Sequence, residues 1–454
     1  MKTVIVGDGK MGYALSMQLS AEGHDVTVID REPRALLQSD NNQDVSCLSG
    51  DGFNLNVLRD AQVDLCDMLI AVTGDDKANL LCCLMAKQIG AAHAIARVRE
   101  PELTATMQSM KEALGIDMIC NPDLEAATEI RRILRLPSAA KVDLFARGKV
   151  ETVEIKLPEG CPIDGMSVSE VSARVRMNML ICAVQRGDDV YIPGGNFVLE
   201  AGDHISITAS PHTIIKFISF VGIQTHKIKN LIIAGGGSGA YYLAQFMLDA
   251  GAAVKLIVSD AAQAEELAER LPKAVVINGS AINRELLLEE RLDNADALVA
   301  MTDYDEENVI IAMHALGINV PKVITCIHHA YFGSMLDRAG IDCVVIPNQI
   351  AASRIMSYTR AIHNSLGSNV RALSRLADGK VEALEFYVSP SFSATGIPLS
   401  ELSIRRDLLI ACISRDGKLI FPHGVDVIMP RDKVIVVAKS GDRVLSDLED
   451  ILVE

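Results

Sequence analysis

The feature that most constrains the fold is an internal duplication of the chain. The segment Thr3–Asp30 begins with a short apolar run and a glycine-rich turn, and Leu231–Ser259 repeats this pattern 228 positions later. A second pair of similar segments begins at Asn178 and Asp407, 229 positions apart. Because both pairs recur at nearly the same spacing, we predict two copies of a two-domain unit, in the order A–B–A′–B′.

Each A unit has the pattern of alternating strands and helices. Apolar runs at residues 3–7, 25–30, 67–73 and 93–98 are separated by amphipathic stretches, and the second copy repeats the alternation. Such alternation is typical of parallel βαβ units. We therefore predict an α/β fold with two Rossmann-like, doubly wound parallel-sheet domains.

Each B unit is shorter and rich in strand-forming residues. A short helix is expected at residues 167–174 in the first copy and at 399–406 in the second. This pattern predicts a small α+β subdomain after each Rossmann-like domain. The predicted domains are residues 1–136, 141–222, 228–364 and 370–454.

Composition excludes several classes of protein. Lys and Arg number 43 against 59 Asp and Glu, and a net charge of −16 argues against nucleic-acid binding. No apolar run approaches the roughly 20 residues of a membrane-spanning helix, and the N-terminus lacks the pattern of a secretory leader. The ten Cys include no C-x-x-C pair. We therefore expect a cytoplasmic protein with reduced, structural cysteines and no metal site.

The first glycine-rich turn has the context of a dinucleotide site. Gly7-x-Gly9-x-x-Gly12 lies between a strand and a helix, and Asp30 ends the next strand. In this context the glycines permit the turn, the approach of a pyrophosphate and helix packing, while the acid accepts hydrogen bonds from the adenosine ribose. Because Asp30 would repel a 2′-phosphate, NAD or an adenine nucleotide is favoured over NADP. The predicted cofactor-binding residues here are Gly7, Asp8, Gly9, Lys10, Met11, Gly12 and Asp30.

Further candidates lie where later strands end. Asp51, in a Gly-Asp-Gly turn, is placed to approach adenine, although a plain turn explains it too. Thr73 and Gly74 follow a strand, at the edge where open α/β sheets bind ligands. Asn79 and Arg97 are candidates for phosphate or ribose, with a surface salt bridge as the alternative for Arg97.

The second copy lacks most of this chemistry. Gly12 becomes Ala240, Asp30 becomes Val258, and Arg97 becomes Cys326. Valine cannot bind a ribose diol, and Asp260 stands two residues further on. We predict weak or no nucleotide binding there and a structural or regulatory role for this half. The doubtful second loop comprises Gly235, Gly236, Gly237, Ser238 and Gly239.

No catalytic residues are predicted. An NAD-dependent oxidoreductase needs a proton donor beside the nicotinamide, and the B units contain no His–acid pair or Cys–His pattern. His328 and His329 are adjacent on an expected strand and point to opposite faces, which disfavours a shared metal. Arg186 and Arg415 precede hairpin turns, where a surface turn is favoured over an anion site.

Five motifs together resemble the cytoplasmic nucleotide-binding subunits of Trk potassium-uptake systems, the TrkA family with tandem RCK domains. They are GDGKMG at Gly7, VID ending at Asp30, GDG at Gly50, AVTGDDKANLL at Ala71 and ARVREPEL at Ala96. The resemblance implies a regulatory subunit that binds NAD or NADH, or ATP or ADP at the same site. Its implied partners are a membrane potassium-translocating subunit and further copies in a ring, a dimer or tetramer, on the inner face of the membrane. An RCK subunit of another channel or antiporter is the alternative.

The resemblance also implies two crossover helices that pair neighbouring units. They follow Asn121 and Pro347. The apolar positions expected to form the first pairing face are Leu124, Ala127, Ile130 and Leu134.

Overall fold

A computed structural model describes residues 1–453 except 43, 136–140, 146–149, 224–227, 329–335, 337–338, 342, 366–369, 377–379, 406–407, 417, 440–444 and 446. It divides into two compact units, one of Met1–Arg131 with Lys229–Met356, the other of Arg132–Ile228 with Ser357–Glu454. The domain boundaries predicted around 136–141, 222–228 and 364–370 fall across residues outside the described ranges. Among the described helices, none is both long and apolar enough to cross a bilayer.

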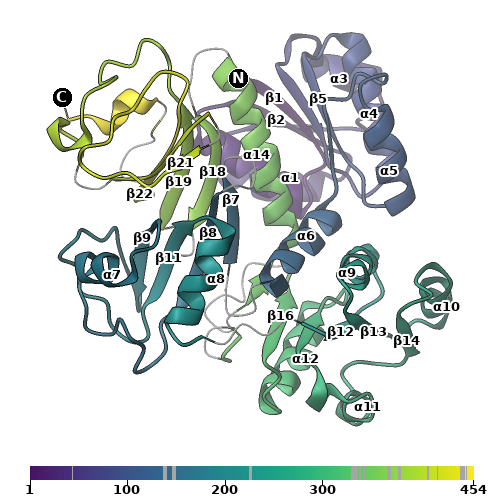
Figure 1. The fold of residues 1–454 in the computed structure, drawn as a ribbon. Coiled ribbons are helices and arrows are strands. Elements are labelled where there is room, and N and C mark those ends of the chain that lie inside the picture. Colours follow the sequence, from purple (N-terminus) through teal and green to yellow (C-terminus); the bar gives the residue numbers. More distant parts are fainter. Residues whose placement is uncertain are drawn as a thin grey trace. The chain divides into compact units, whose positions relative to one another are not determined.

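The first unit contains both Rossmann-like domains (Figure 1). In the first half the elements are β1 (Lys2–Val6), α1 (Lys10–Ala21), β2 (Asp25–Asp30), α2 (Pro33–Asn42), β3 (Ser46–Ser49), α3 (Leu55–Asp60), β4 (Met68–Ala71), α4 (Asp76–Ile89), β5 (His93–Arg97), α5 (Pro101–Met110), β6 (Met118–Cys120) and α6 (Pro122–Arg135). In the second they are β12 (Asn230–Ala234), α9 (Ser238–Asp249), β13 (Ala253–Val258), α10 (Ala261–Arg270), β14 (Val275–Asn278), α11 (Arg284–Glu289), β15 (Ala297–Ala300), α12 (Asp305–Gly317), β16 (Lys322–Cys326), β17 (Val344–Val345) and α14 (Pro347–Ser365).

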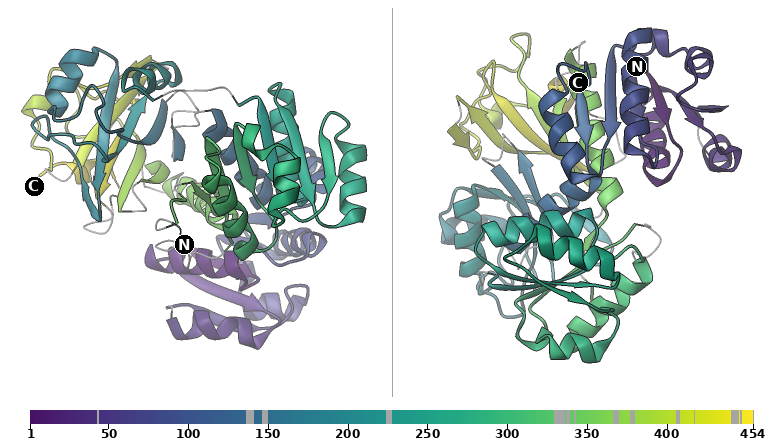
Figure 2. Two further views of the ribbon diagram at one scale, coloured as in Figure 1. Left: turned by 90° about the horizontal axis from the view of Figure 1, so that it is seen from below. Right: turned by 90° about the vertical axis from the view of Figure 1, so that its right-hand side faces the viewer.

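Both sheets have the doubly wound order that the sequence predicts. The first is β3-β2-β1-β4-β5-β6, and the second is β14-β13-β12-β15-β16-β17. Helices cover both faces of each sheet (Figure 2), so the central strands are buried on both sides and consist of continuous apolar residues. The chain reverses its strand order between β1 and β4, which opens a crevice at the carboxyl ends of these strands.

The helices α6 and α14 join the two halves of this unit. The carboxylate of Glu125 on α6 forms an ion pair with Arg354 on α14, and Cys120 Sγ lies 3.9 Å from the carbonyl oxygen of Ala351. Ala127 and Ile130 are fully buried within the single chain. Part of the apolar face predicted to pair neighbouring units is therefore covered within one chain, by contacts between its two halves.

The second unit contains two five-stranded antiparallel sheets. They are built from β7 (Lys141–Phe145), β8 (Val150–Lys156), β9 (Met179–Arg186), β10 (Asp189–Tyr191) and β11 (His204–Ala209), and from β18 (Val370–Leu376), β19 (Val381–Tyr387), β20 (Leu408–Arg415), β21 (Lys418–Ile420) and β22 (Lys433–Lys439). Helices α7 (Val168–Val175) and α8 (Pro211–Phe220) belong to the first subdomain. The helix expected at 399–406 is only a three-residue 3₁₀ helix, Leu399–Glu401, because Ile404 instead forms a β-bridge to Leu452.

One apolar cluster joins these two subdomains. It includes Cys182 and Ala183 of the first copy together with Ala411, Cys412 and Ile435 of the second. Each subdomain also has a core cluster of its own, so this shared cluster adds buried apolar surface between the two sheets.

A buried ion pair occurs at the same place in both subdomains. Arg186 Nε and Nη2 donate to the two carboxylate oxygens of Asp203 at 2.7 and 2.8 Å, and Arg415 binds Asp432 in the same way at 2.9 and 2.7 Å. Both carboxylates are 1% exposed. Because each guanidinium is bound bidentately by a carboxylate of its own subdomain, the structure favours the structural interpretation of these arginines over an anion site.

Replacing Ile130 tests whether the apolar face of α6 belongs to the chain's own core. Ile130→Asp is expected to lower the free energy of unfolding by about 3–5 kcal/mol, since it removes buried contacts and buries a carboxylate. The control, Ile130→Val, is expected to cost about 1 kcal/mol. Urea denaturation followed by circular dichroism measures both. Unchanged unfolding with a smaller oligomer mass would contradict this assignment.

Candidate functional site

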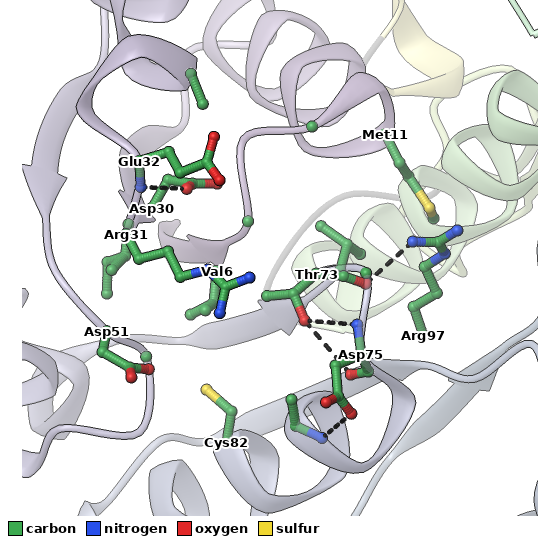
Figure 3. Close-up of a pocket in the computed structure, with 18 of the residues that line it drawn as sticks. Val6, Met11, Asp30, Arg31, Glu32, Asp51, Thr73, Asp75, Cys82 and Arg97 are labelled. Atoms are coloured by element: carbon green, nitrogen blue, oxygen red, sulfur yellow. Dashed lines mark hydrogen bonds between the residues drawn. The ribbon is translucent and has the colours of Figure 1, made fainter.

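A cavity of about 720 Å³ lies at the carboxyl edge of the first parallel sheet. Its walls come from the glycine-rich turn, the ends of β2 and β4, and the turn after β3 (Figure 3). It has the size and the position of ligand pockets in open α/β folds. Nine of the residues predicted for the site line it: Gly7, Gly9, Lys10, Met11, Asp30, Asp51, Thr73, Gly74 and Arg97.

Two glycines allow α1 to begin against the sheet. Gly7 has φ +103°, and a side chain there would lie 2.9 Å from the backbone nitrogen of Thr73. A Cβ on Gly12 would lie 1.8 Å from the carbonyl oxygen of Gly7, which no rearrangement of side chains relieves. Gly12 does not line the cavity; it lets the helix approach the turn. Gly9 has nothing within 4 Å of its would-be Cβ, so the turn is open there.

The N-terminus of α1 is a suitable place for an anion. Its N-cap is Gly9, which offers no side-chain hydrogen bond, and no acid stands in the first helical turn. The first backbone N–H groups of a helix have no partner within the helix, and the helix dipole gives this end a partial positive charge. Lys10 lines the same cavity and adds a full positive charge. Phosphate groups bind such helix ends.

The Asp30 carboxylate fixes the glycine-rich turn at the end of β2. Asp30 Oδ2 accepts a hydrogen bond from the backbone N–H of Asp8 at 2.7 Å, and Oδ1 accepts one from that of Glu32 at 2.8 Å. Each carboxylate oxygen keeps further lone pairs for other donors. Asp30 therefore combines a structural role with the capacity to accept hydrogen bonds from a ligand.

Asp8 does not line the cavity. Its two carboxylate oxygens accept hydrogen bonds from the hydroxyl of Ser39 at 2.9 and 2.7 Å. Asp8 is 6% exposed, and burial raises the pKa of its carboxyl above the ordinary value. The structure thus places this predicted site residue in the contact between the turn and α2.

Asn79 holds together the ends of two strands. Its side-chain oxygen accepts hydrogen bonds from Thr73 N and Oγ1 at 2.9 and 2.7 Å, and its nitrogen donates to the carbonyl oxygens of Thr73 and Arg97 at 3.1 and 3.0 Å. Asn79 is fully buried and does not line the cavity. It positions Thr73 and Arg97, which do line it.

Arg97 presents an unsatisfied donor. Its Nη1 donates to the carbonyl oxygen of Thr73 at 3.0 Å, while the buried Nε has no hydrogen-bond partner. Burial and the nearby Arg99 lower the pKa of the guanidinium, and the Asp123 carboxylate opposes that shift. Among the described residues Arg97 forms no ion pair, so the alternative of a surface salt bridge is not supported.

Several lining residues were not predicted. Arg31 follows Asp30 directly, and Figure 3 shows its side chain reaching toward the middle of the cavity. Phe53 and Cys82 line the side near Asp51. The position of Arg31, directly after the acid that ends β2, could have indicated from the sequence that it lies at the site. Asn348 also lines the cavity, but it belongs to the second half, and no local pattern around the first turn indicates it.

The second glycine-rich turn has different surroundings. A Cβ on Gly236 would lie 2.4 Å from Gln263 Oε1 and 2.6 Å from Val258 Cγ1, so these side chains fill the space beside it. Asp260 caps α10 by accepting a hydrogen bond from the backbone N–H of Gln263 at 2.8 Å. An equivalent asparagine also joins two strand ends in the second half. Asn308 forms hydrogen bonds with the backbone of Thr302 and Cys326, as Asn79 does with the backbone of Thr73 and Arg97, and we call this arrangement the asparagine clamp.

No group of side chains in the described part of the chain could hold a metal ion. His328 contacts the Asp305 carboxylate, with 2.9 Å between Nδ1 and Oδ1, and His329 lies outside the described residues. The ten cysteines are free thiols, and nine of them are buried.

Comparison with known proteins decides the family. A model described as the TrkA-N domain matches residues 3–122 and again residues 231–347, together more than half of the chain. A TrkA-C domain model matches residues 152–222. The chain belongs to the TrkA family. Its two TrkA-N regions coincide with the two parallel-sheet domains.

Relatives of this TrkA chain match over nearly its full length. The Trk system potassium uptake protein TrkA homolog 2 of Methanosarcina mazei is 29% identical over 449 residues, covering 97% of this chain and 98% of that protein. The Trk system potassium uptake protein TrkA of Haemophilus influenzae is 28% identical over 457 residues, covering 99% and 96%.

Solved structures show the same fold. The GsuK RCK domain aligns with a TM-score of 0.63 at 17% identity, covering 97% of this chain and 92% of that one. The GsuK channel bound to NAD also aligns at 0.63 and 17% identity, covering 97% and 77%. The TrkA chain therefore has the fold of RCK domains.

The repeated asparagine clamp offers a matched pair of variants. Asn79→Ala and Asn308→Ala are each expected to lower the free energy of unfolding by about 2–3 kcal/mol, because each leaves buried backbone groups without partners. Differential scanning calorimetry of both variants measures the loss. A large loss in one variant and none in the other would show that the two clamps are not equivalent.

Proposed function

We propose that this TrkA chain is the nucleotide-binding regulatory subunit of a Trk-type potassium-uptake system, and that its ligand is NAD or NADH, with ATP or ADP as competitors for the same site. The observation that supports this most directly is the convergence, on one cavity, of an uncapped helix N-terminus and the guanidinium-bearing side chain of Arg97. These are donors for phosphate. Asp30, on the other wall, is an acceptor for ribose hydroxyls.

The proposed ligand fits this distribution of charge. Phosphates would lie at the N-terminus of α1, near Lys10 and Arg97. The adenosine ribose would donate hydrogen bonds to Asp30, and the adenine would lie toward Asp51 and Phe53. The residues of the first half that line the cavity would supply binding and orientation.

The relatives and structural neighbours support both ligand and partner. Two GsuK structures are described as bound to NAD and to ADP, and the curated relatives are named as Trk system potassium uptake proteins. By analogy we propose a membrane potassium-translocating partner and assembly into a ring of RCK units on the cytoplasmic side. Such a subunit acts by conformation, since a ligand shifts an equilibrium only through its different affinities for the two states.

Calorimetric titration of NADH, NAD⁺, ATP and ADP tests the ligand. One site per chain is expected for the preferred nucleotide. Asp30→Ala is expected to weaken binding at least about tenfold, because hydrogen bonds to a charged acceptor are lost. NADPH is expected to bind less tightly than NADH, since its 2′-phosphate would lie beside the Asp30 carboxylate.

The matched control is Asp260→Ala. Asp260 lies two residues after Val258, the position equivalent to Asp30, and its carboxylate caps the N-terminus of α10. The substitution is expected to change the dissociation constant by less than about twofold, as distant sites act independently. No binding of any of the four nucleotides would overturn the proposed ligand. Two sites per chain would overturn the assignment of the second half as degenerate.

Potassium flux tests the regulatory role. The full chain reconstituted with a Trk translocating subunit in vesicles is expected to show flux that changes on adding the preferred nucleotide. Asp30→Ala is expected to abolish that change while leaving the subunits associated. Turnover of NADH with carbonyl compounds would instead support an oxidoreductase.

A further inference from the structure

The helices α6 and α14 begin with the same pattern but differ at one charged position. Pro122-Asp123 begins α6 as Pro347-Asn348 begins α14, and Ala126-Ala127 recurs as Ala351-Ala352, each 225 positions later. The residue that follows the proline is therefore an acid in the first half and an amide in the second.

Asp123 lies at the second glycine-rich turn. Its Oδ2 accepts a hydrogen bond from the hydroxyl of Ser238, the first residue of α9, at 2.8 Å. A Cβ on Gly239 would be 3.8 Å from the Cβ of Asp123. The first half thus places one of its carboxylates at the N-terminus of α9, the end of a helix that favours an anion.

Asn348 lies in the reciprocal position. It lines the first cavity together with Gly9, Lys10 and Met11, the residues at the start of α1. Its helix is fixed to the first half by the ion pair between Arg354 and Glu125. Each half therefore supplies the first turn of its crossover helix to the glycine-rich turn of the other.

The two turns differ in the pair of side chains beside them. Lys10 and Ser238 are equivalent positions in the repeat, 228 residues apart. The first turn has Lys10 and the neutral Asn348 beside it, whereas the second has Ser238 and the Asp123 carboxylate. The start of α1 therefore has a cation and an amide beside it, while a carboxylate stands at the start of α9.

We propose that Asn348 is a phosphate-contacting residue, supplied to the first site by the second half of the chain, whose neutrality is required for phosphate binding. This rests on the proposed function. Its amide can donate a hydrogen bond to a phosphate oxygen, whereas an acid in its place would repel the phosphates and pair with Lys10.

Calorimetry of the full chain with NADH and ADP tests the proposal. Asn348→Asp is expected to weaken binding of the preferred nucleotide by at least about tenfold, since a like charge is placed in the wall of the cavity proposed to hold the phosphates. The loss is expected to shrink as salt is added, because exposed charges are screened. Asn348→Ala is expected to weaken binding only a few-fold, because it removes one hydrogen bond and adds no charge.

Gln349→Glu is the matched control. It adds the same charge one residue further along the first turn of α14, at an exposed position that does not line the cavity. It is expected to bind like the wild type, and thermal melts are expected to show all three variants folded. Wild-type affinity in Asn348→Asp, or equal losses in Asn348→Asp and Gln349→Glu, would overturn this proposal alone. A wild-type chain that binds no nucleotide would overturn the proposed function together with it.

Discussion

The close approach of α1 to the first strand is the contact on which the site depends. A Cβ on Gly12 would lie 1.8 Å from the Gly7 carbonyl oxygen, so the first turn in its present conformation has room only for a glycine at this position. This approach aims the free N–H groups of α1 at the crevice where the strand order reverses. Asp30 then holds the turn in place through the backbone N–H of Asp8, at the cost of part of its own hydrogen-bonding capacity.

The two halves show which parts of such a domain support the fold and which serve a ligand. The asparagine clamp at the ends of two strands is present in both, as Asn79 and as Asn308, and both are fully buried. The strand-ending acid is present only in the first half, since Val258 replaces it in the second. Hydrogen bonds that satisfy buried backbone groups were kept through duplication, while exposed groups able to bind a ligand diverged.

Most of the candidate site could be predicted because its residues lie at fixed places in a βαβ pattern. The ends of parallel strands and the starts of the following helices meet at one sheet edge, which brings Asp30, Thr73 and Arg97 to the same cavity. The same reasoning does not separate these residues from Asp8 and Asn79, whose side chains form hydrogen bonds with neighbouring protein groups and do not line the cavity. Nothing in the spacing of the sequence distinguishes a side chain that faces a ligand from one that faces the protein.

The sequence by itself determined the duplication, the two parallel sheets and the loss of the strand-ending acid in the second half. These follow from residue type and period, which act locally along the chain. Only the tertiary structure decided that Ile130 is covered within one chain, and that Asn348 and Asp123 each reach the glycine-rich turn of the other half. Such contacts join residues more than 100 positions apart, and they depend on how two helices pack, which no local pattern specifies.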